Sequence, residues 1–178
     1  MKRKSRKLRV NVIDKQDVIN ARVKKFMKNQ GLIVYGGRSI NAQANILTRE
    51  TNDWDALSNN PKKTAYDLQK ALDKIVKGNY YYSKPAIHKG TFKVKGIGND
   101  LIKGTKDDEG IADFSIPEGR DKRVKFKMIN GIKYRNLKEE IRRKKITLTE
   151  PEKKFRHEKD RGDLNRIRAN IKIKRLLK

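Results

Sequence analysis

The sequence predicts an α+β fold, with a small mixed β-sheet flanked by helices and a basic helical segment at the C-terminal end. Apolar residues recur at helical spacing in several segments, and short β-rich runs that end in turn residues lie between them. Helices and strands therefore alternate, which is typical of a mixed sheet covered by helices. We divide the chain into a basic N-terminal tail (1–13), the mixed domain (14–135) and the basic helical C-terminal segment (136–178), which is expected to pack on that domain.

Five elements are expected in the first half of the chain. They are a helix over 15–30, a strand over 32–37, a short helix over 39–47, a strand over 51–58 and a helix over 61–78. Pro61 at the start of the last helix and Gly78 at its end are typical boundary residues. In the short helix, Ile40, Ala44 and Leu47 are expected to face inward.

The second half of the chain is expected to add strands and then helices. Strands are predicted over the apolar runs at 90–97 and 110–117. The segment 123–134 predicts a hairpin, because Asn130 and Gly131 form a preferred two-residue turn. The rest of the chain predicts one or two basic helices, whose outer face is either solvated or in contact with a nucleic-acid backbone.

The composition is strongly basic. Lys and Arg number 47 and Asp and Glu number 21 among 178 residues, so the formal net charge is +26. Such a field attracts polyanions, and we predict a nucleic-acid partner, RNA or DNA; a basic solvated surface without a specific partner is the alternative. No apolar run reaches the ~18 residues of a membrane span, so no membrane association is expected. The absence of cysteine excludes disulfides and thiolate metal sites and favours an intracellular protein.

A pair of glycines stands between a predicted strand and a predicted helix. Glycine lets the backbone approach a ligand closely, and the first turn of the following helix offers free N–H groups. Gly36 and Gly37, followed by Arg38 and Ser39, are therefore candidates for binding a phosphate. A tight turn without a ligand is the alternative interpretation.

Three aspartates are candidates for a metal site. In a strand, Asp53 and Asp55 would project from the same side, with Trp54 facing the core, and such close carboxylates are unfavourable without a cation. Asp113 lies inside an apolar run, where it is costly unless it is paired or ligating. Mg²⁺ or Mn²⁺ suits carboxylate oxygens, and two such ions suit phosphoryl or nucleotidyl transfer. Alternatively, Asp53 and Asp55 are exposed aspartates on an edge strand without a ligand. Asp107, Asp108 and Glu109 are the other candidates for the third carboxylate in place of Asp113.

These motifs resemble those of the DNA polymerase beta-like nucleotidyltransferase superfamily. That pattern is an apolar strand, Gly-Gly or Gly-Ser, a short helix, Asp-x-Asp and a later acidic residue on another strand; the corresponding segments here are "VYGG", "RSINAQ", "DWD" and "IADFSI". "RETNDWDAL" is similar to the Arg-x-Ser/Thr-x-Asp-x-Asp form of the abortive-infection toxin nucleotidyltransferases, and "FRHEKDRGDL" resembles the closing helix of that branch. The resemblance spans roughly 32–164; Arg38 stands where many relatives carry a small residue.

The resemblance implies a role for each matched residue. Nucleotide phosphates would be contacted by the glycine pair, with Arg38 and Ser39, and the metal ions would be held by Asp53, Asp55 and Asp113. Lys145 or Lys159 would neutralise phosphate, and Asp160 or Asp163 would orient the site. The implied activity is metal-dependent transfer of an NMP from an NTP to a hydroxyl, which the basic charge suggests belongs to nucleic acid, such as an RNA 3′ end. A protein partner such as an antitoxin is a further expectation, and a binding protein with little or no catalysis on the same fold is the alternative.

Overall fold

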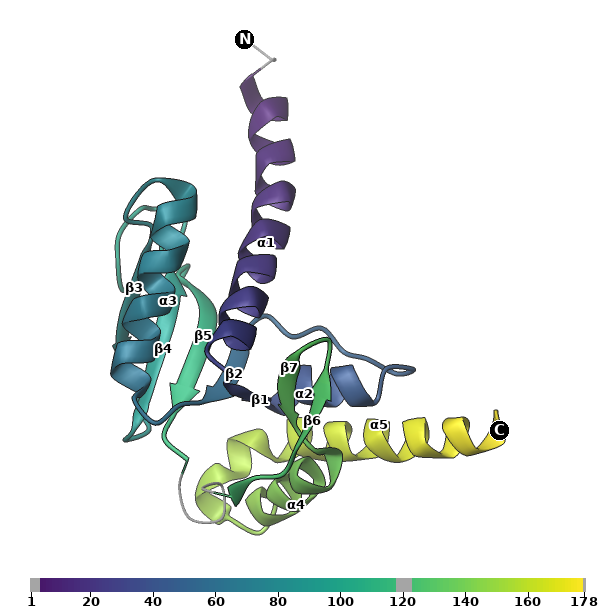
Figure 1. Cartoon of the computed structure of the whole chain (residues 1–178). Helices are drawn as coiled ribbons and strands as arrows, with labels where there is room; N and C mark the ends of the chain where they lie inside the picture. The colour runs from purple at the N-terminus through teal and green to yellow at the C-terminus, as the bar shows by residue number, and fades with distance from the viewer. Residues whose placement is uncertain (1–3, 118–122, 178) are drawn as a thin grey trace.

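The computed structural model describes residues 4–117 and 123–177, with side chains from residue 16 onward. Five α-helices, seven strands and one 3-10 helix lie in these ranges (Figure 1). In chain order they are α1 (Lys4–Asn29), β1 (Ile33–Tyr35), α2 (Gly36–Gln43), β2 (Trp54–Leu57), α3 (Pro61–Val76), β3 (Tyr81–Pro85), β4 (Thr91–Gly96), β5 (Glu109–Ser115), β6 (Phe126–Ile129), β7 (Ile132–Arg135), α4 (Leu137–Thr147), η2 (Pro151–Arg156) and α5 (His157–Leu176).

The seven strands form one mixed sheet in the order β3-β4-β5-β2-β1-β7-β6. The pairs β2–β5 and β1–β7 are parallel and the other pairs are antiparallel. The α+β class and the mixed sheet are therefore as the sequence predicts. In the centre of the sheet Tyr35 pairs with Asp55, and Asp55 pairs with Asp113, so these three side chains share one face.

The main core lies on the opposite face of the sheet, beneath α1 and α3. It contains Val23 and Met27 from α1, Leu68 and Leu72 from α3, and Phe114 from β5, all with no exposed surface. Burial of each such side chain contributes about 1.5–3 kcal/mol. Because this face is filled, the face that carries the aspartates is the one left available for a ligand.

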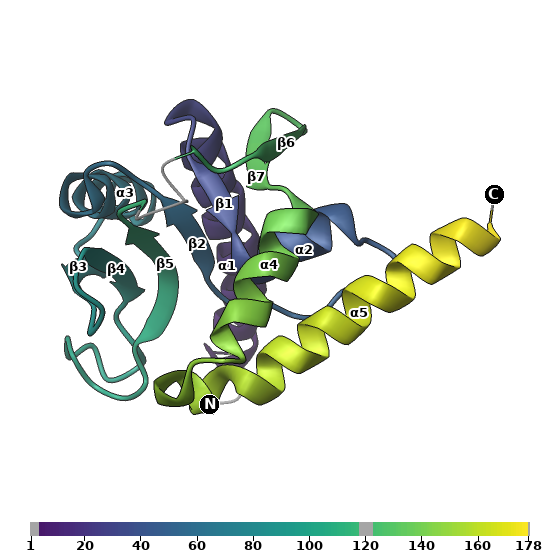
Figure 2. The same cartoon turned by 90° about the horizontal axis from the view of Figure 1, so that it is seen from below.

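The C-terminal helices pack on α2, and the last of them extends away from the sheet. A smaller core joins Ile40 and Ala44 of α2 to Ile167 of α5, with Leu137 and Ile141 of α4 packed against it. Figure 2 shows α4 crossing beside α2 and β1, and α5 continuing as a long helix away from the sheet. The C-terminal segment thus contacts the element that begins with the glycine pair.

Local signals account for several boundaries. The Asn60 side chain accepts a hydrogen bond from the backbone N–H of Lys63 (3.1 Å) and Pro61 occupies the first turn of α3, so this helix starts where predicted. Asn130 and Gly131 both have positive φ (51° and 78°), as a two-residue hairpin turn requires. The hairpin prediction is confirmed.

Three boundaries differ from the predictions. α1 begins at Lys4, because no Gly or Pro interrupts the chain before residue 15; residues 1–3 of the predicted tail lie outside the described residues. The short helix starts earlier, at Gly36, and Leu47 lies beyond it and is 40% exposed. The strand predicted from residue 51 starts only at Trp54, so Asp53 directly precedes the strand. Within the described residues, no helix combines the length and apolar character needed to cross a membrane.

Candidate active site

Two of the predicted aspartates lie side by side at the centre of the sheet. Asp55 on β2 and Asp113 on β5 are in register on parallel strands, whose backbones lie about 4.8 Å apart. Burial, followed by the negative charges of Asp53 and Asp113, raises the pKa of Asp55 to about 7. Burial also raises the pKa of Asp113. We call Asp53, Asp55 and Asp113 the carboxylate row.

Two other candidates for the third carboxylate, Asp107 and Asp108, form hydrogen bonds within a loop. The Asp108 carboxylate accepts hydrogen bonds from the Tyr82 hydroxyl (2.6 Å) and from the backbone N–H groups of Gly98 (3.0 Å) and Gly104 (2.6 Å), so it closes its own loop. Asp107 accepts from the Thr105 hydroxyl at 2.6 Å in the same loop. Only Asp113 among these candidates is in register with Asp55, which favours it as the third carboxylate.

The donor chemistry of the carboxylate row suits a divalent cation. Two carboxylates whose charge is disfavoured by burial and by each other gain from a hard cation, and Mg²⁺ commonly binds through one or two carboxylates together with substrate phosphates. Among the described residues, however, no three His, Asp or Glu side chains lie close enough to hold a metal by themselves. Asp113 forms an ion pair with Lys93 at 2.8 Å, which occupies one of its oxygens.

The glycine pair lies directly against the carboxylate row. Gly36 and Gly37, which we call the glycine corner, form the first turn of α2. Gly36 has a φ of +71°, and a Cβ at this position would lie 2.7 Å from Oδ2 of Asp55. A Cβ on Gly37 would lie 2.5 Å from Cγ2 of Thr51. Both positions therefore require glycine, and the backbone of the corner comes as close to Asp55 as the chain allows.

A buried glutamate, which no sequence pattern marked as a site residue, also contacts the glycine corner. Glu140 of α4 is 2% exposed and its Oε1 accepts a hydrogen bond from the backbone N–H of Gly36 at 2.8 Å. Burial raises the pKa of Glu140 to about 7, against the opposing charge of Arg135. Glu140 fixes the corner to the C-terminal segment, and it occupies one of the N–H groups that a phosphate would otherwise use.

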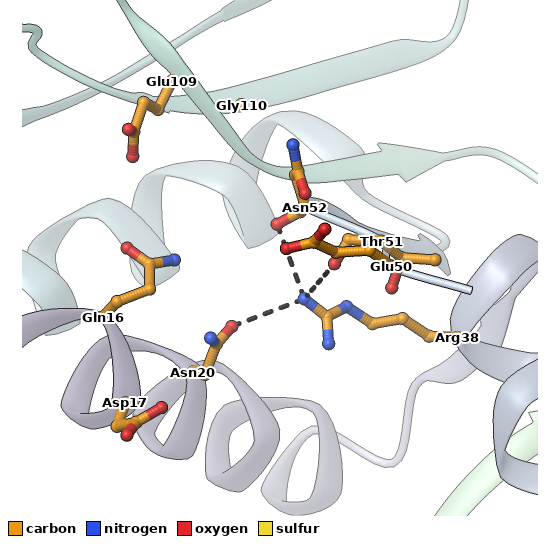
Figure 3. A pocket seen from close by; sticks show the side chains of 9 residues that line it. All are labelled: Gln16, Asp17, Asn20, Arg38, Glu50, Thr51, Asn52, Glu109 and Gly110. Atoms are coloured by element: carbon orange, nitrogen blue, oxygen red, sulfur yellow. Dashed lines mark hydrogen bonds between the residues drawn. The ribbon is translucent and has the colours of Figure 1, made fainter. Parts of the chain in front are cut away.

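Arg38 and Ser39 hold the backbone, which differs from the phosphate contacts implied by the resemblance. The Arg38 guanidinium donates to the carbonyl oxygens of Asp53 (2.8 Å) and Thr51 (3.1 Å) and lies 4.2 Å over the ring of Trp54. Figure 3 shows it reaching across a cavity to α1 and the 50–52 segment. Ser39 has no exposed surface and its hydroxyl donates to the Arg135 carbonyl at 2.7 Å. The two side chains position the corner and Asp53 through these backbone contacts.

The two adjacent lysines of α4, Lys144 and Lys145, differ in burial. Lys145 is exposed, whereas Lys144 is 6% exposed and forms ion pairs with Asp160 (2.6 Å) and Asp163 (2.8 Å). Asp160 and Asp163 are each 1% exposed, so a buried Asp160 is in no position to touch a nucleotide. The rotation of α4 turns residue 144 and not 145 toward α5, so Lys145 is exposed and its contact with phosphate stays a prediction.

The ion-pair network reaches the strand that carries Asp55. Asp163 also accepts hydrogen bonds from Arg49 (2.9 Å) and Arg166 (2.6 Å), and Arg49 lies in the segment that leads to Asp53. Burial opposes the charge of Asp163, but the bonds from Arg49 and Lys144 hold its pKa below the usual range. Lys159 lies within electrostatic reach of the site, because its charge lowers the pKa of Asp55, and its contact with phosphate stays a prediction.

Comparisons with known proteins identify the fold. No family model and no curated protein matches the sequence. Among solved structures, the Megavirus polyadenylate synthase covers 88% of this chain with a TM-score of 0.60 and 20% identity, and the chain spans 31% of that protein. JHP933 from Helicobacter pylori covers 72% of this chain with a TM-score of 0.45 and 12% identity, and the chain spans 54% of it. The chain has a nucleotidyltransferase-type fold.

This fold confirms the predicted fold class, while the superfamily and its toxin-type branch stay predictions. In this fold the predicted glycine corner, Asp55 and Asp113 come together at one place. Sequence reasoning missed Glu140 and Lys144, because their positions depend on how α4 is rotated. An acidic residue three positions into a capped helix is ordinary in a first turn, so Glu140 carried no distinguishing signal.

Proposed function

We propose that the chain transfers a nucleoside monophosphate from an NTP to a hydroxyl of nucleic acid, such as an RNA 3′ end, in a reaction that depends on Mg²⁺ or Mn²⁺. The observation that carries this proposal is the meeting of Asp55, Asp113 and the glycine corner on a nucleotidyltransferase-type fold. The net charge of +26 supports a polyanionic acceptor.

Each part of the site has a role in this reaction. The backbone N–H groups of the glycine corner would bind phosphates of the NTP, as the first turn of a helix does. Asp53, Asp55 and Asp113 would hold two divalent ions, which supply positive charge at the transferred phosphate and lower the pKa of the acceptor hydroxyl. Lys159 and Arg156 lie close enough to act on the Asp55 charge and would neutralise phosphate charge there. Arg38 would keep Asp53 in place through its backbone.

A labelled-nucleotide assay tests the proposal. Each radiolabelled NTP is incubated with the protein, Mg²⁺ or Mn²⁺ and total RNA, and label in the RNA is measured. Asp53→Asn is expected to reduce transfer by at least about 100-fold without loss of folding, because even supporting residues of metal sites cost about 10- to 100-fold. Asp67→Asn on α3, a partly exposed carboxylate on the helix that covers the opposite face of the sheet, is the control and is expected to keep full activity.

A nucleic-acid-binding protein with little or no catalysis is the second candidate. The ion pair of Lys93 with Asp113 favours it, because a lysine that neutralises one carboxylate weakens the case for a metal there. Salt-sensitive RNA binding without incorporation of any labelled NTP would support this candidate, and full activity of Asp53→Asn would defeat the metal assignment. An antitoxin partner stays a prediction from the resemblance.

A further inference from the structure

A basic cavity of about 300 Å³ adjoins the carboxylate row. Its volume is at the lower end of ligand sites, which span about 300–1,000 Å³. Six basic side chains line it and none of its described lining residues is acidic; the basic residues are His88, Lys89, Arg135, Arg143, Lys153 and Arg156. Lys153 forms an ion pair with Glu150 at 2.6 Å, and the other five basic side chains concentrate positive charge on one small cavity, which indicates an anionic ligand.

Hydroxyl groups complete the wall of the basic cavity. The Tyr35 hydroxyl lies 3.1 Å from Oγ of Ser115, which lies 2.9 Å from Oγ1 of Thr91. The Arg135 guanidinium lies 4.5 Å over the Tyr35 ring and is 4% exposed, so the ring and the charge are held together. Hydroxyls and guanidinium groups are donors that phosphate oxygens accept from.

A larger cavity behind Arg38 lacks this character. It has a volume of about 570 Å³, and its lining includes the acidic residues Asp17, Glu50 and Glu109 (Figure 3). The Arg38 guanidinium, its one basic group among the described lining residues, is bonded to the backbone. A polyanion is therefore expected at the basic cavity and not at this one.

The register of the strands places the basic cavity opposite the glycine corner. Leu57 and Ser115 of the cavity lie two residues beyond Asp55 and Asp113 on the parallel strands β2 and β5, a rise of about 6.6 Å. The corner lies toward the other ends of these strands, because a Cβ on Gly37 would touch Thr51 and Arg49. The carboxylate row therefore lies between the glycine corner and the basic cavity.

In-line transfer places the acceptor and the leaving group on opposite sides of the reacting phosphate. The attacking hydroxyl and the leaving pyrophosphate lie roughly in line, on opposite sides of the transferred phosphorus. If the triphosphate is bound at the glycine corner, the hydroxyl approaches from the side of the basic cavity, and the phosphodiesters next to it arrive there too. We propose, on the basis of the function above, that the basic cavity binds the phosphodiesters at the 3′ end of a single-stranded nucleic-acid acceptor.

A charge-matched pair of variants tests this assignment. Lys89→Ala with Arg143→Ala removes two exposed charges from the cavity, and Lys74→Ala with Lys106→Ala removes two exposed charges elsewhere. The cavity variant is expected to weaken binding of a fluorescent single-stranded oligonucleotide by at least about tenfold, since bonds to charged groups are among the stronger contacts. In a plot of log affinity against log salt concentration, the slope for the cavity variant is expected to be less negative by about 1.4, because each lost phosphate contact with a single strand changes the slope by roughly 0.7. The control variant is expected to change both by much less.

Kinetics separate the acceptor from the nucleotide as the occupant. The cavity variant is expected to raise the KM for the acceptor at least about tenfold while the KM for the NTP changes by less than about twofold. A rise confined to the KM for the NTP would overturn the assignment, because the cavity would then hold the triphosphate. Equal losses of oligonucleotide affinity in both variants would overturn it as well. The oligonucleotide-binding measurement does not depend on catalysis. If the unmodified protein transferred no nucleotide, the proposed function would be refuted, and the binding measurement alone would decide whether the cavity holds the acceptor.

Discussion

Substituting Lys144 by alanine tests whether the C-terminal helices are held by the buried ion-pair network. The Lys144 ammonium is within 2.8 Å of carboxylates of both Asp160 and Asp163, and all three residues are at most 6% exposed. Asp163 retains Arg49 and Arg166 after the change, but no other ion pair of Asp160 is known in the described structure. Removing one partner of a buried pair costs about 3–5 kcal/mol, so we expect a loss near 3 kcal/mol.

Urea unfolding followed by circular dichroism measures this loss. With a urea m-value of about 2 kcal/mol/M for a small domain, 3 kcal/mol lowers the midpoint by about 1.5 M. Lys145→Ala is the matched control, because this neighbour is exposed and surface changes stay within about 0.5 kcal/mol. If both variants lowered the midpoint equally, Lys144 would contribute no more than its exposed neighbour and the network would not hold the helices.

The other predictions concern the site. Burial raises the pKa of Asp55 to about 7, so between about pH 4 and pH 7 the folded protein keeps a proton on Asp55 that the unfolded chain releases. The stability of the folded protein therefore falls as the pH rises through this range. Asp55→Asn is expected to remove at most about 4 kcal/mol of this fall, so the urea midpoints of the variant and the unmodified protein should agree near pH 4 and differ at pH 8. Identical pH profiles would contradict this. Gly36→Ala is expected to cost about 1–2 kcal/mol in thermal unfolding from its positive φ alone, whereas Gly110→Ala, with open space around it, costs much less; equal costs would refute the strain expected at position 36. Arg38→Lys is expected to displace Asp53 and so to lower kcat about tenfold or more, with little change in the KM for the NTP. A rise in the KM for the NTP without a change in kcat would instead indicate that Arg38 contacts a phosphate of the NTP, as the resemblance implies.

Local chemistry made much of the fold predictable. Asn60 and Pro61 start α3, and the pair Asn130 and Gly131 turns the hairpin, because each acts through its own backbone or that of its immediate neighbours. The inward position of Trp54, now 5% exposed, followed from the alternation of side chains near a strand.

The candidate site was only partly predictable. Gly36, Asp55 and Asp113 were identified because a glycine pair before a helix and acids in apolar strands are unusual on their own. Their meeting in register, however, follows from the pairing of β2 with β5, which no local pattern specifies.

By itself, the sequence determined the mixed α+β class, the basic charge and a short set of candidate carboxylates, since these depend on composition and on neighbours along the chain. Only the tertiary structure decided that Glu140 bonds to Gly36, 104 residues away, and that Lys144 rather than Lys145 is buried. The physical reason is that helix rotation and strand order are set by how distant apolar surfaces pack. A shift of one residue on a helix changes the direction of a side chain by about 100° without altering the local pattern.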